Sequence, residues 1–591
     1  MMGSSVGRRW WNRARRRVHG RALPVWYAAE YRPPLAATAH TSGFEPRRAD
    51  LALWYLLAAG LLDTRDLNTP ALATWADLQR VHGAAFLDSL THGDTLARVF
   101  AVEQREMPVD AMLDTLRLAC GGTIAAARHA LKHGGPTLNL LGGFHHARPD
   151  HAGAMCALND VAVAVKVVRA HGFEGQVCIV DLDAHPPDGI EMCLKDDPKV
   201  WIGSLSGADW GDLGAVDETL LPENTGDEAY LVALRALLDR MPAPGLTFVL
   251  AGGDVLANDQ LGALGLTVEG AARRDACVVK TLGEGPAVWL PAGGYSTPAW
   301  RVLAGTATVL TLGEVELVPT TADPLASRFA RVAQQLEHLD GDDDVLFTEA
   351  DLVGGLGLPG IEAPIRLLGF YSASGVELAL SQYKLLDHVR RLGYSDLSVH
   401  LHNDPAGDVF RLHGRADGVE HTLVEACLSR DEVDGETVLY VNWLTLRHPR
   451  AAFSAQRPAL PGQDVPGLGL ARETTVLLGR MAERLHLVGV AFRPASYHVA
   501  YSARHQCSFA DPARQGRFRA LRAALANLPL IDATRVVDQG KVLLNGEVYT
   551  WEPDLMVHWL KPQERIDVDE IERAQAAAKF VVVGEAAAAE V

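Results

Sequence analysis

The chain has 591 residues, enough for two or more domains at the usual size of about 100–200 residues each. Hydrophobic residues make up 48% and charged residues 22%, a composition that is typical of globular proteins and argues against a mostly disordered or fibrous chain. The formal net charge of −18 disfavours direct binding along a nucleic-acid backbone.

The N-terminus differs in charge from the rest of the chain. Residues 1–21 contain seven arginines and no acidic residue, which leaves −25 on the remainder. We expect residues 1–22 to form a basic tail that is either solvated and mobile or in contact with an anion. The chain shows no apolar signal segment, no membrane-length apolar run and no CxxC pair among its seven cysteines, so we expect a cytoplasmic protein with reduced thiols and no membrane partner.

Residues 23–313 alternate short apolar runs with helical patterns. Runs of strand length lie at 136–141, 177–180, 247–251 and 287–291, and helical patterns include 159–171 and 228–240. This alternation predicts an α/β domain in which helices flank a parallel sheet on both faces.

The second half of the chain has a different pattern. Residues 314–362 are expected to be a linker region, because one helix (324–339) is followed by an acidic run and a Gly-rich stretch. Residues 363–591 are expected to form an α+β accessory domain. Its expected elements are a helix at 375–392, strands at 396–402, 408–412, 421–428 and 437–446, a helix at 471–485 and a strand at 487–493.

Glycines and then polar side chains follow the apolar strands of the first domain. The four segments are Gly142-Gly143-Phe144-His145-His146, Asp181-Leu182-Asp183-Ala184-His185, Gly252-Gly253-Asp254 and Gly293-Gly294-Tyr295. The carboxyl ends of parallel strands meet at one edge of a sheet, where ligands bind in such folds. We therefore expect these segments to share one crevice.

The second segment has the spacing of a metal site. Asp181, Asp183 and His185 alternate, so they would share one face of an extended segment. With Asp254 from another strand, they offer two carboxylates and an imidazole and leave a position for water and substrate. Catalytic zinc fits this set, with iron or cobalt as alternatives.

The remaining polar residues fit proton transfer beside that metal. His145 and His146 are expected to move protons, and Tyr295 to donate a hydrogen bond to a developing oxyanion. Asp188, three residues after His185, is expected to orient one of the two histidines.

These segments resemble the zinc-dependent histone deacetylase family over about residues 23–312. The family patterns GG-x-HHA, D-x-D-x-H, G-x-D with a further Asp, and GGY are matched at 142–147, 181–185, 252–259 and 293–295. The runs at 121–131 and 195–202 resemble class IV members and their bacterial relatives. The resemblance implies the arginase-like α/β fold.

The resemblance also implies roles for individual residues. Asp183, His185 and Asp254 would bind zinc, His146 would act as general base and then acid with His145 as its partner, and Tyr295 would polarise the amide carbonyl. Asp181 would support His145 and, with Ser204, hold a potassium ion, and Asp188 would support His146. The implied reaction is hydrolysis of an acylated lysine side chain of a protein or peptide.

Two departures from the family pattern affect this expectation. Pro186-Pro187 follows the metal-binding histidine, which stiffens the turn leading to Asp188. Ala154 and Met155 replace a glycine and a phenylalanine of the family's acyl tunnel, to which Gly294 is also assigned. These changes favour an acyl group other than acetyl, such as a longer one.

The second domain is similar to the acetyl-CoA-binding core of GNAT-type acyltransferases. The similarity rests on the strand–loop–helix–strand run from Thr437 to Arg493, with a Gly-rich loop at 463–471. Four functions therefore stay open: a metal-dependent acyl-lysine deacylase, a bifunctional deacylase and acyltransferase, a hydrolase of small acylated amines such as polyamines, and a non-catalytic acyl-lysine binding module.

Overall fold

A computed structural model describes residues 5–18, 22–35, 44–102, 104–339, 365–453, 458–504, 506–560 and 567–583. The chain forms two compact units, Met1–Arg328 and Phe329–Val591, and the division falls inside helix α12 (Pro324–Leu339). The bounds of α12 match the helix predicted for the linker region. The acidic run and the Gly-rich stretch that were expected to follow it lie outside the described residues.

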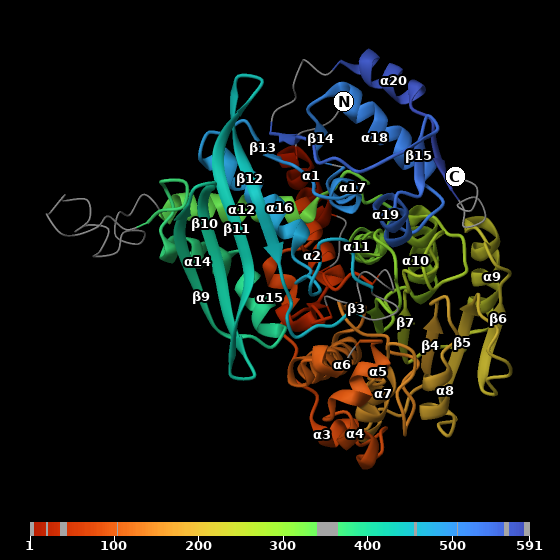
Figure 1. Ribbon diagram of the computed structural model, residues 1–591. Helices are drawn as coiled ribbons and strands as arrows, with labels where there is room; N and C mark the ends of the chain where they lie inside the picture. Colours follow the sequence, from red (N-terminus) through yellow and green to blue (C-terminus); the bar gives the residue numbers. More distant parts are fainter. Residues whose placement is uncertain are drawn as a thin grey trace, which may run out of the picture. The chain divides into compact units, whose positions relative to one another are not determined.

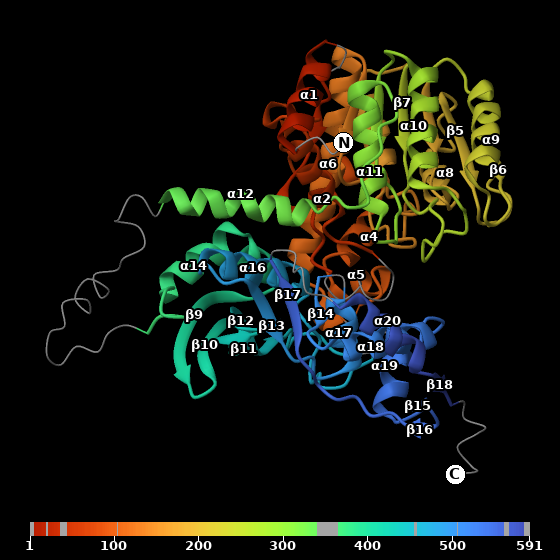
Figure 2. The same ribbon diagram turned by 90° about the horizontal axis from the view of Figure 1, so that it is seen from above.

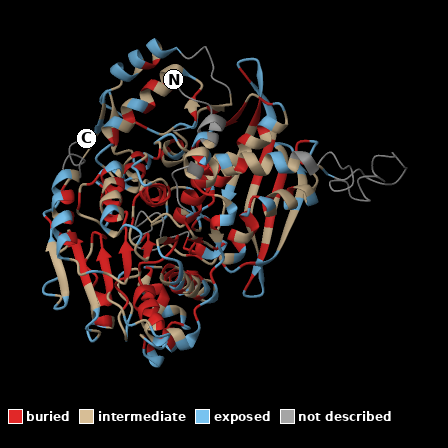
Figure 3. Ribbon diagram, turned by 180° about the vertical axis from the view of Figure 1, so that it is seen from behind, coloured by how far each residue is buried: buried red, intermediate tan, exposed pale blue. Residues whose placement is uncertain are grey.

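An eight-stranded sheet forms the centre of the first unit (Figure 1). Its order is β2-β1-β3-β8-β7-β4-β5-β6, and all of these pairings are parallel. The strands are β1 (Val25–Trp26), β2 (Leu67–Asn68), β3 (Pro136–Asn139), β4 (Val177–Asp181), β5 (Val200–Ser206), β6 (Val216–Leu220), β7 (Leu246–Leu250) and β8 (Ala287–Leu290). Every residue of β4, β7 and β8 is buried, as expected of strands covered on both faces (Figure 3).

Two groups of helices flank this sheet. The helices are α1 (Ser5–Val18), α2 (Arg48–Ala59), α3 (Trp75–Leu78), α4 (Ala84–Ser89), α5 (Gly93–Val99), α6 (Val109–His133), α7 (Asp160–Ala170), α8 (Asp188–Leu194), α9 (Asp227–Arg240), α10 (Val268–Leu282) and α11 (Ala299–Leu312). Helix α6 packs on α7, whereas α10 packs on α9 and α11, and α11 packs on α2. The first unit therefore has the predicted α/β fold, a parallel sheet flanked by helices.

Helix α1 occupies part of the segment that was expected to be a basic tail. Asn12 is buried, and its amide donates a hydrogen bond of 3.0 Å to the carbonyl oxygen of Ala59. Arg16 forms an ion pair of 2.6 Å with Asp66, and Arg15 pairs with Glu316 at 2.8 Å. Acidic residues of the same unit thus neutralise part of the arginine charge of this segment.

The cysteines and the helices bear on the expected compartment. All seven cysteines lie in described residues and carry free thiols. None of the helices that the structure describes combines the length and the apolar character needed to cross a membrane. A cytoplasmic location stays a prediction.

The second unit is built on a mixed seven-stranded sheet, β14-β17-β13-β12-β11-β10-β9. Its strands are β9 (Ser395–Asp404), β10 (Gly407–Ala416), β11 (Val419–Val433), β12 (Glu436–Leu446), β13 (Gly489–Phe492), β14 (Ser508–Phe509) and β17 (Met556–Trp559), and β15 (Val542–Leu544), β16 (Glu547–Val548) and β18 (Phe580–Val582) form a small separate sheet. Strands β9 to β12 form an antiparallel meander, and β12 pairs in parallel with β13. Asp417-Gly418 and Asp434-Gly435 form two of its turns, with the positive φ values that tight hairpins need.

Helices pack against this mixed sheet, which confirms the α+β class (Figure 2). They are α14 (Ala373–Gln382), α15 (Leu385–Arg391), α16 (Ala471–Arg484), α17 (Tyr497–Ala503), α18 (Pro512–Ala524), α19 (Leu530–Asp538) and α20 (Val568–Ala577). The prediction of one continuous helix at 375–392 is wrong. Lys384 adopts a left-handed conformation (φ 65°), which ends α14 and starts α15 in a new direction.

Candidate active site

Asp183, His185 and Asp254 come together beyond the carboxyl ends of β4 and β7. Each offers one ligand atom, and these three atoms lie within 4.8 Å of one another. His185 Nδ1 is 3.1 Å from Asp183 Oδ1 and 3.1 Å from Asp254 Oδ2. The other ring nitrogen, Nε2, lies 3.1 Å from the carbonyl oxygen of Leu261, so a proton on Nε2 leaves Nδ1 as a free ligand atom.

The charges of this triad fit a cation. Both carboxylates are fully buried, and no arginine or lysine of the described residues forms an ion pair with either. Burial and the neighbouring charge of Asp183 raise the pKa of Asp254. Two buried carboxylates beside one imidazole therefore form a suitable donor set for a divalent metal.

The local geometry differs from the extended segment that the alternating spacing suggested. Strand β4 ends at Asp181, and Asp183 and His185 lie in the turn that follows. The turn is held by hydrogen bonds from the Asp183 amide to Asp181 Oδ1 and from the His185 amide to Asp183 Oδ1, each 3.0 Å. The three side chains converge because the carboxylates order the turn, and not because a strand alternates.

Each of the two adjacent histidines has its own carboxylate. His145 Nδ1 is 2.8 Å from Asp181 Oδ2, and His146 Nδ1 is 2.6 Å from Asp188 Oδ1. Asp188 begins α8 directly after the proline pair, so the stiffened turn still presents it to His146. The imidazole centroids are 4.0 Å apart, so a charge on one ring affects the other.

The environment gives the two histidines opposite protonation preferences. Burial disfavours the charged form of His145, but Asp181 and Asp183 outweigh burial and raise its pKa to about 9. Burial and the positive charge of His145 lower the pKa of His146 to about 4. The two histidines thus have opposite preferences, and His146 is the one whose surroundings favour the neutral form that accepts a proton.

Tyr295 is positioned by its backbone. Its amide donates a hydrogen bond of 2.8 Å to Asp259, which lies five residues after Asp254. Arg48, at the start of α2, donates to the carbonyl oxygens of Ala292 and Gly293 at 2.6 Å each. Burial raises the pKa of the Tyr295 hydroxyl well above its usual range, so the hydroxyl stays protonated as a donor.

Gly293 permits the close approach of this loop to the triad. Its amide donates a hydrogen bond of 2.7 Å to Asp183. A Cβ at position 293 would lie 2.5 Å from Asp254 and 2.6 Å from Asp183, a separation that side chains do not tolerate. The glycine thus brings the tyrosine loop against the metal-binding carboxylates.

Ser204 lies beside Asp181 on the neighbouring strand β5. Its hydroxyl oxygen is buried and has no hydrogen-bond partner within the described residues. A buried hydroxyl without a partner is costly, so it favours a ligand at this position. This is the place that the sequence assigns to potassium.

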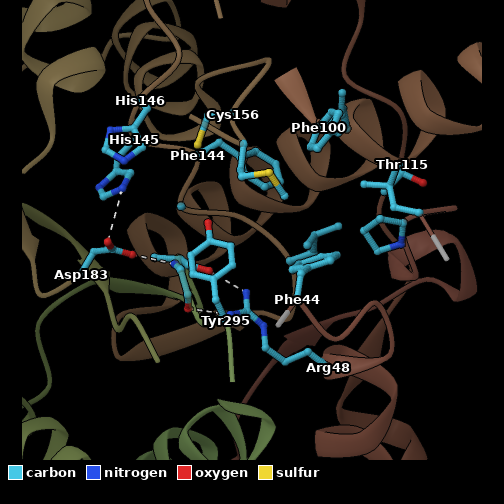
Figure 4. Close-up of a pocket in the computed structure, with 18 of the residues that line it drawn as sticks. Phe44, Arg48, Phe100, Thr115, Phe144, His145, His146, Cys156, Asp183 and Tyr295 are labelled. Carbon is cyan, nitrogen blue, oxygen red and sulfur yellow. Dashed lines mark hydrogen bonds and ion pairs between the residues drawn. The ribbon is translucent and has the colours of Figure 1, made fainter. Parts of the chain in front are cut away.

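One pocket contains the histidines, Asp183, His185 and Tyr295, and it continues between apolar side chains (Figure 4). These include Leu35, Phe44, Phe100, Met112, Leu116, Leu141, Phe144 and Met155. Of the three residues assigned to the acyl tunnel, Met155 lines this pocket. Ala154 lines a separate surface pocket, and the loop contributes Gly293 rather than Gly294 to the metal pocket.

Two further residues reach the site without a prediction from the sequence. Trp210 follows β5, stacks on His146 with ring centroids 4.8 Å apart and is 44% exposed. A search of the residues after every strand end would have found it. Arg48 lies more than 240 residues from the carbonyls it holds, and no local pattern indicates that contact.

A family model described as the histone deacetylase domain matches residues 42–310. An uncharacterised protein of Picosynechococcus sp. is 32% identical over 287 residues, which are 46% of this chain and 92% of that protein. Histone deacetylase 2 of Arabidopsis thaliana is 31% identical over 272 residues, which are 42% of this chain and 68% of that protein. The crystal structure of a histone deacetylase homologue from Aquifex aeolicus has 25% sequence identity and a TM-score of 0.41, over 47% of this chain and 80% of that one.

The first unit is an amide hydrolase domain of a class that generally depends on a metal ion. The chain belongs to the histone deacetylase family. The matched residues contain the triad, both histidine–carboxylate pairs and the tyrosine loop.

Proposed function

We propose that the first unit hydrolyses the acyl amide of a modified lysine side chain in a zinc-dependent reaction. One observation carries the proposal: the histidine pair, Asp183, His185 and Tyr295 line one pocket together with apolar side chains, and Asp254 completes the metal triad beside it. Asp183, His185 and Asp254 would hold the ion, which when bound supplies a Lewis acid for the amide carbonyl and a water molecule. Fe²⁺ is the alternative ion for the same donor set.

His146 is the group that would move the proton. Its Nδ1 is engaged by Asp188, which leaves Nε2 to accept a proton from the attacking water. The same nitrogen then returns a proton to the departing lysine amine. Charged His145, held by Asp181, would favour the negative charge that develops beside it.

Tyr295 would donate its hydroxyl proton in a hydrogen bond to the carbonyl oxygen as that oxygen gains negative charge. The loop that carries Tyr295 is fixed at three points, by Asp259, Arg48 and Asp183. A donor that is fixed before the reaction loses little free energy to reorganisation, which is the basis of oxyanion stabilisation.

Two ancillary features belong to the same proposal. A potassium ion near Asp181 and Ser204 would satisfy the buried serine hydroxyl and hold the strand end that supports His145. The apolar part of the pocket supports acyl groups longer than acetyl, because Phe100, Met112 and Leu116 offer apolar surface against which a longer acyl chain would be buried.

A panel of substrates tests this function. The chain would be incubated with lysine peptides that carry acyl groups from acetyl to myristoyl, and with free acetylated polyamines. We expect release of acyl groups from the peptides, with higher kcat/KM for chains longer than acetyl. Turnover confined to polyamines would instead indicate a small-amine hydrolase. No release from any substrate by zinc-loaded protein would indicate a binding module and contradict the proposal.

The sheet of the second unit supports a second function, binding of an acyl-CoA. Strands β12 and β13 pair in parallel only over Leu439–Val441, α16 connects them, and a Gly-rich loop precedes α16. A Gly-rich loop at the N-terminus of a helix that connects two parallel strands suits a pyrophosphate-bearing cofactor, as in GNAT-type enzymes. Calorimetry with acetyl-CoA tests this function, and absence of heat at concentrations up to the millimolar range would exclude it.

A further inference from the structure

Two arginines of the second unit lie against the same aromatic ring. The guanidinium carbon of Arg504 is 3.7 Å from the centroid of the Tyr501 ring, and that of Arg522 is 5.8 Å from it. Arg504 directly follows α17, whereas Arg522 lies in the last turn of α18. Two separate elements therefore place both cations within 6 Å of the centre of one tyrosine ring.

The aromatic ring is itself anchored in the core of the unit. The Tyr501 ring is 5.8 Å from that of Tyr497, which is 2% exposed. Arg522 also lies 5.7 Å from the ring of Phe518, a buried member of the same cluster. Stacking of this kind fixes the plane of a guanidinium group and leaves its edge free for hydrogen bonds.

Neither guanidinium group has a carboxylate partner within the part of the chain that the structure describes. The hydrogen bond found there is from Arg504 Nη1 to the carbonyl oxygen of Tyr501, at 2.6 Å. The Nε atoms of Arg504 and Arg522 are buried and have no hydrogen-bond partner. Burial lowers the pKa of Arg504 below its usual value, and the positive charge of Arg522 lowers it further.

Two other arginines of α18 have hydrogen-bond or ion-pair partners. Arg514 donates hydrogen bonds to the Tyr549 hydroxyl and to the Glu552 carbonyl oxygen, and Arg517 lies 3.8 Å from the Asp511 carboxylate. The whole chain has 73 acidic residues against 55 lysines and arginines, so acidic partners are not scarce. Arg504 and Arg522 thus lack the side-chain partners that these two neighbours have.

We propose that Arg504 and Arg522 form a binding site for a phosphate group, supplied either by inorganic phosphate or by the end of a phosphate monoester. A phosphate group carries close to two negative charges at neutral pH and matches the two cations. Its tetrahedral oxygens accept hydrogen bonds from two guanidinium groups at once, and such charge-assisted bonds are strong. The site is independent of the hydrolytic reaction proposed for the first unit.

Calorimetric titration of the full chain tests the site, with inorganic phosphate and glycerol phosphate as the probes and sodium chloride at matched ionic strength as the reference. We expect saturable binding of at least one probe. Arg522→Gln and Arg504→Gln are each expected to raise the dissociation constant about tenfold or more, because each removes one charged donor. Tighter binding of the monoester would identify the ligand as an ester, and tighter binding of phosphate would identify the free ion.

Arg519→Gln is the matched control, because Arg519 is exposed on the same helix and the substitution removes the same charge. It is expected to leave both dissociation constants unchanged. Unfolding midpoints without phosphate show whether each variant is folded, and the two variants on different elements test the pair independently. Equal affinity in wild type, Arg504→Gln and Arg522→Gln, or no binding beyond the chloride reference, would overturn the proposal.

Discussion

The two sheets of this molecule place their polar side chains in different ways. In the first unit all strands are parallel, so four strand ends bring their polar residues to one edge, and residues that follow three of them line one pocket. In the second unit the meander alternates direction, and one parallel pair, β12 and β13, gives a single strand end of that kind. Sheet topology therefore decides whether separated motifs can be assigned to one site.

The largest effect is expected at the edge of the parallel sheet. Asp183→Asn removes one of the two charged ligands of the triad, so both bound zinc and turnover should fall to background. Zinc content and acyl-lysine hydrolysis would be measured on the same preparation. Asp217→Asn, at an exposed pair with Arg240, is the matched control and should retain both. Wild-type turnover in Asp183→Asn would show that hydrolysis does not depend on this ligand of the triad.

Tyr295→Phe tests whether the fixed loop contributes a donor to the transition state. We expect kcat to fall about 10²–10³-fold with little change in KM, because one oxyanion donor is lost and the ring remains. Steady-state kinetics would separate the two constants. Tyr440→Phe in the meander of the second unit is the control and should leave both unchanged. A rise in KM alone would mean that the hydroxyl binds the ground state.

His82 provides a prediction about the stability of the first unit. Its Nε2 accepts the Asn159 amide and its Nδ1 lies 2.9 Å from the Arg148 carbonyl oxygen, so the fold holds it neutral. Burial lowers its pKa to about 4. The unfolded chain binds a proton at His82 more readily than the folded chain does. Acid therefore favours unfolding through this residue: the free energy of unfolding keeps its full value above pH 6.5 and decreases by about 3 kcal/mol as the pH falls toward 4.

Urea unfolding of the first unit at several pH values between 4 and 7 checks this prediction. The free energy of unfolding of the wild type should decrease with acid more steeply than that of His82→Gln. The pH profile of the variant contains the effect of all other groups that titrate in this range, so the difference between the two profiles reports on His82. Parallel pH profiles of the two proteins would show that His82 is not the group responsible.

The smallest expected effect concerns the rim of the pocket. Trp210→Ala removes the ring that stacks on His146, and aromatic contacts of this kind contribute about 0.5–1.5 kcal/mol. We expect kcat/KM to fall up to about tenfold, with stability unchanged because the indole is 44% exposed. Trp75→Ala, a similarly exposed tryptophan of the same unit, is the control. An unchanged kcat/KM would remove Trp210 from the site.

Much of the first unit was predictable from its sequence, because buried parallel strands leave continuous apolar runs. The four predicted runs became β3, β4, β7 and β8, which are adjacent in the sheet. The short edge strands β1 and β2 have two residues each and leave no such run. The histidine–carboxylate pairs followed from motifs, whereas the contact of Arg48 with the tyrosine loop depends on tertiary packing that no local pattern encodes.

The remaining differences between prediction and structure have identifiable physical causes. The alternating acids at the end of β4 suggested an extended segment, but the carboxylate of Asp181 accepts a hydrogen bond from the amide of Asp183, and the chain turns there. Lys384 interrupts a helical pattern by adopting a left-handed conformation that sequence periodicity does not show. The arginines of α1 left open a solvated tail or contact with an anion, because acidic partners such as Asp66 and Glu316 are distant in sequence.

Reconstitution of metal-free protein is the most direct test of the central claim, that Asp183, His185 and Asp254 hold the metal on which acyl-lysine hydrolysis depends. Zinc would be removed with a chelator and then added back in steps, with bound zinc and peptide deacylation measured at each step. We predict no turnover in the metal-free chain and a linear recovery that ends at one zinc ion per chain. Full turnover in protein shown to be free of metal would contradict the account.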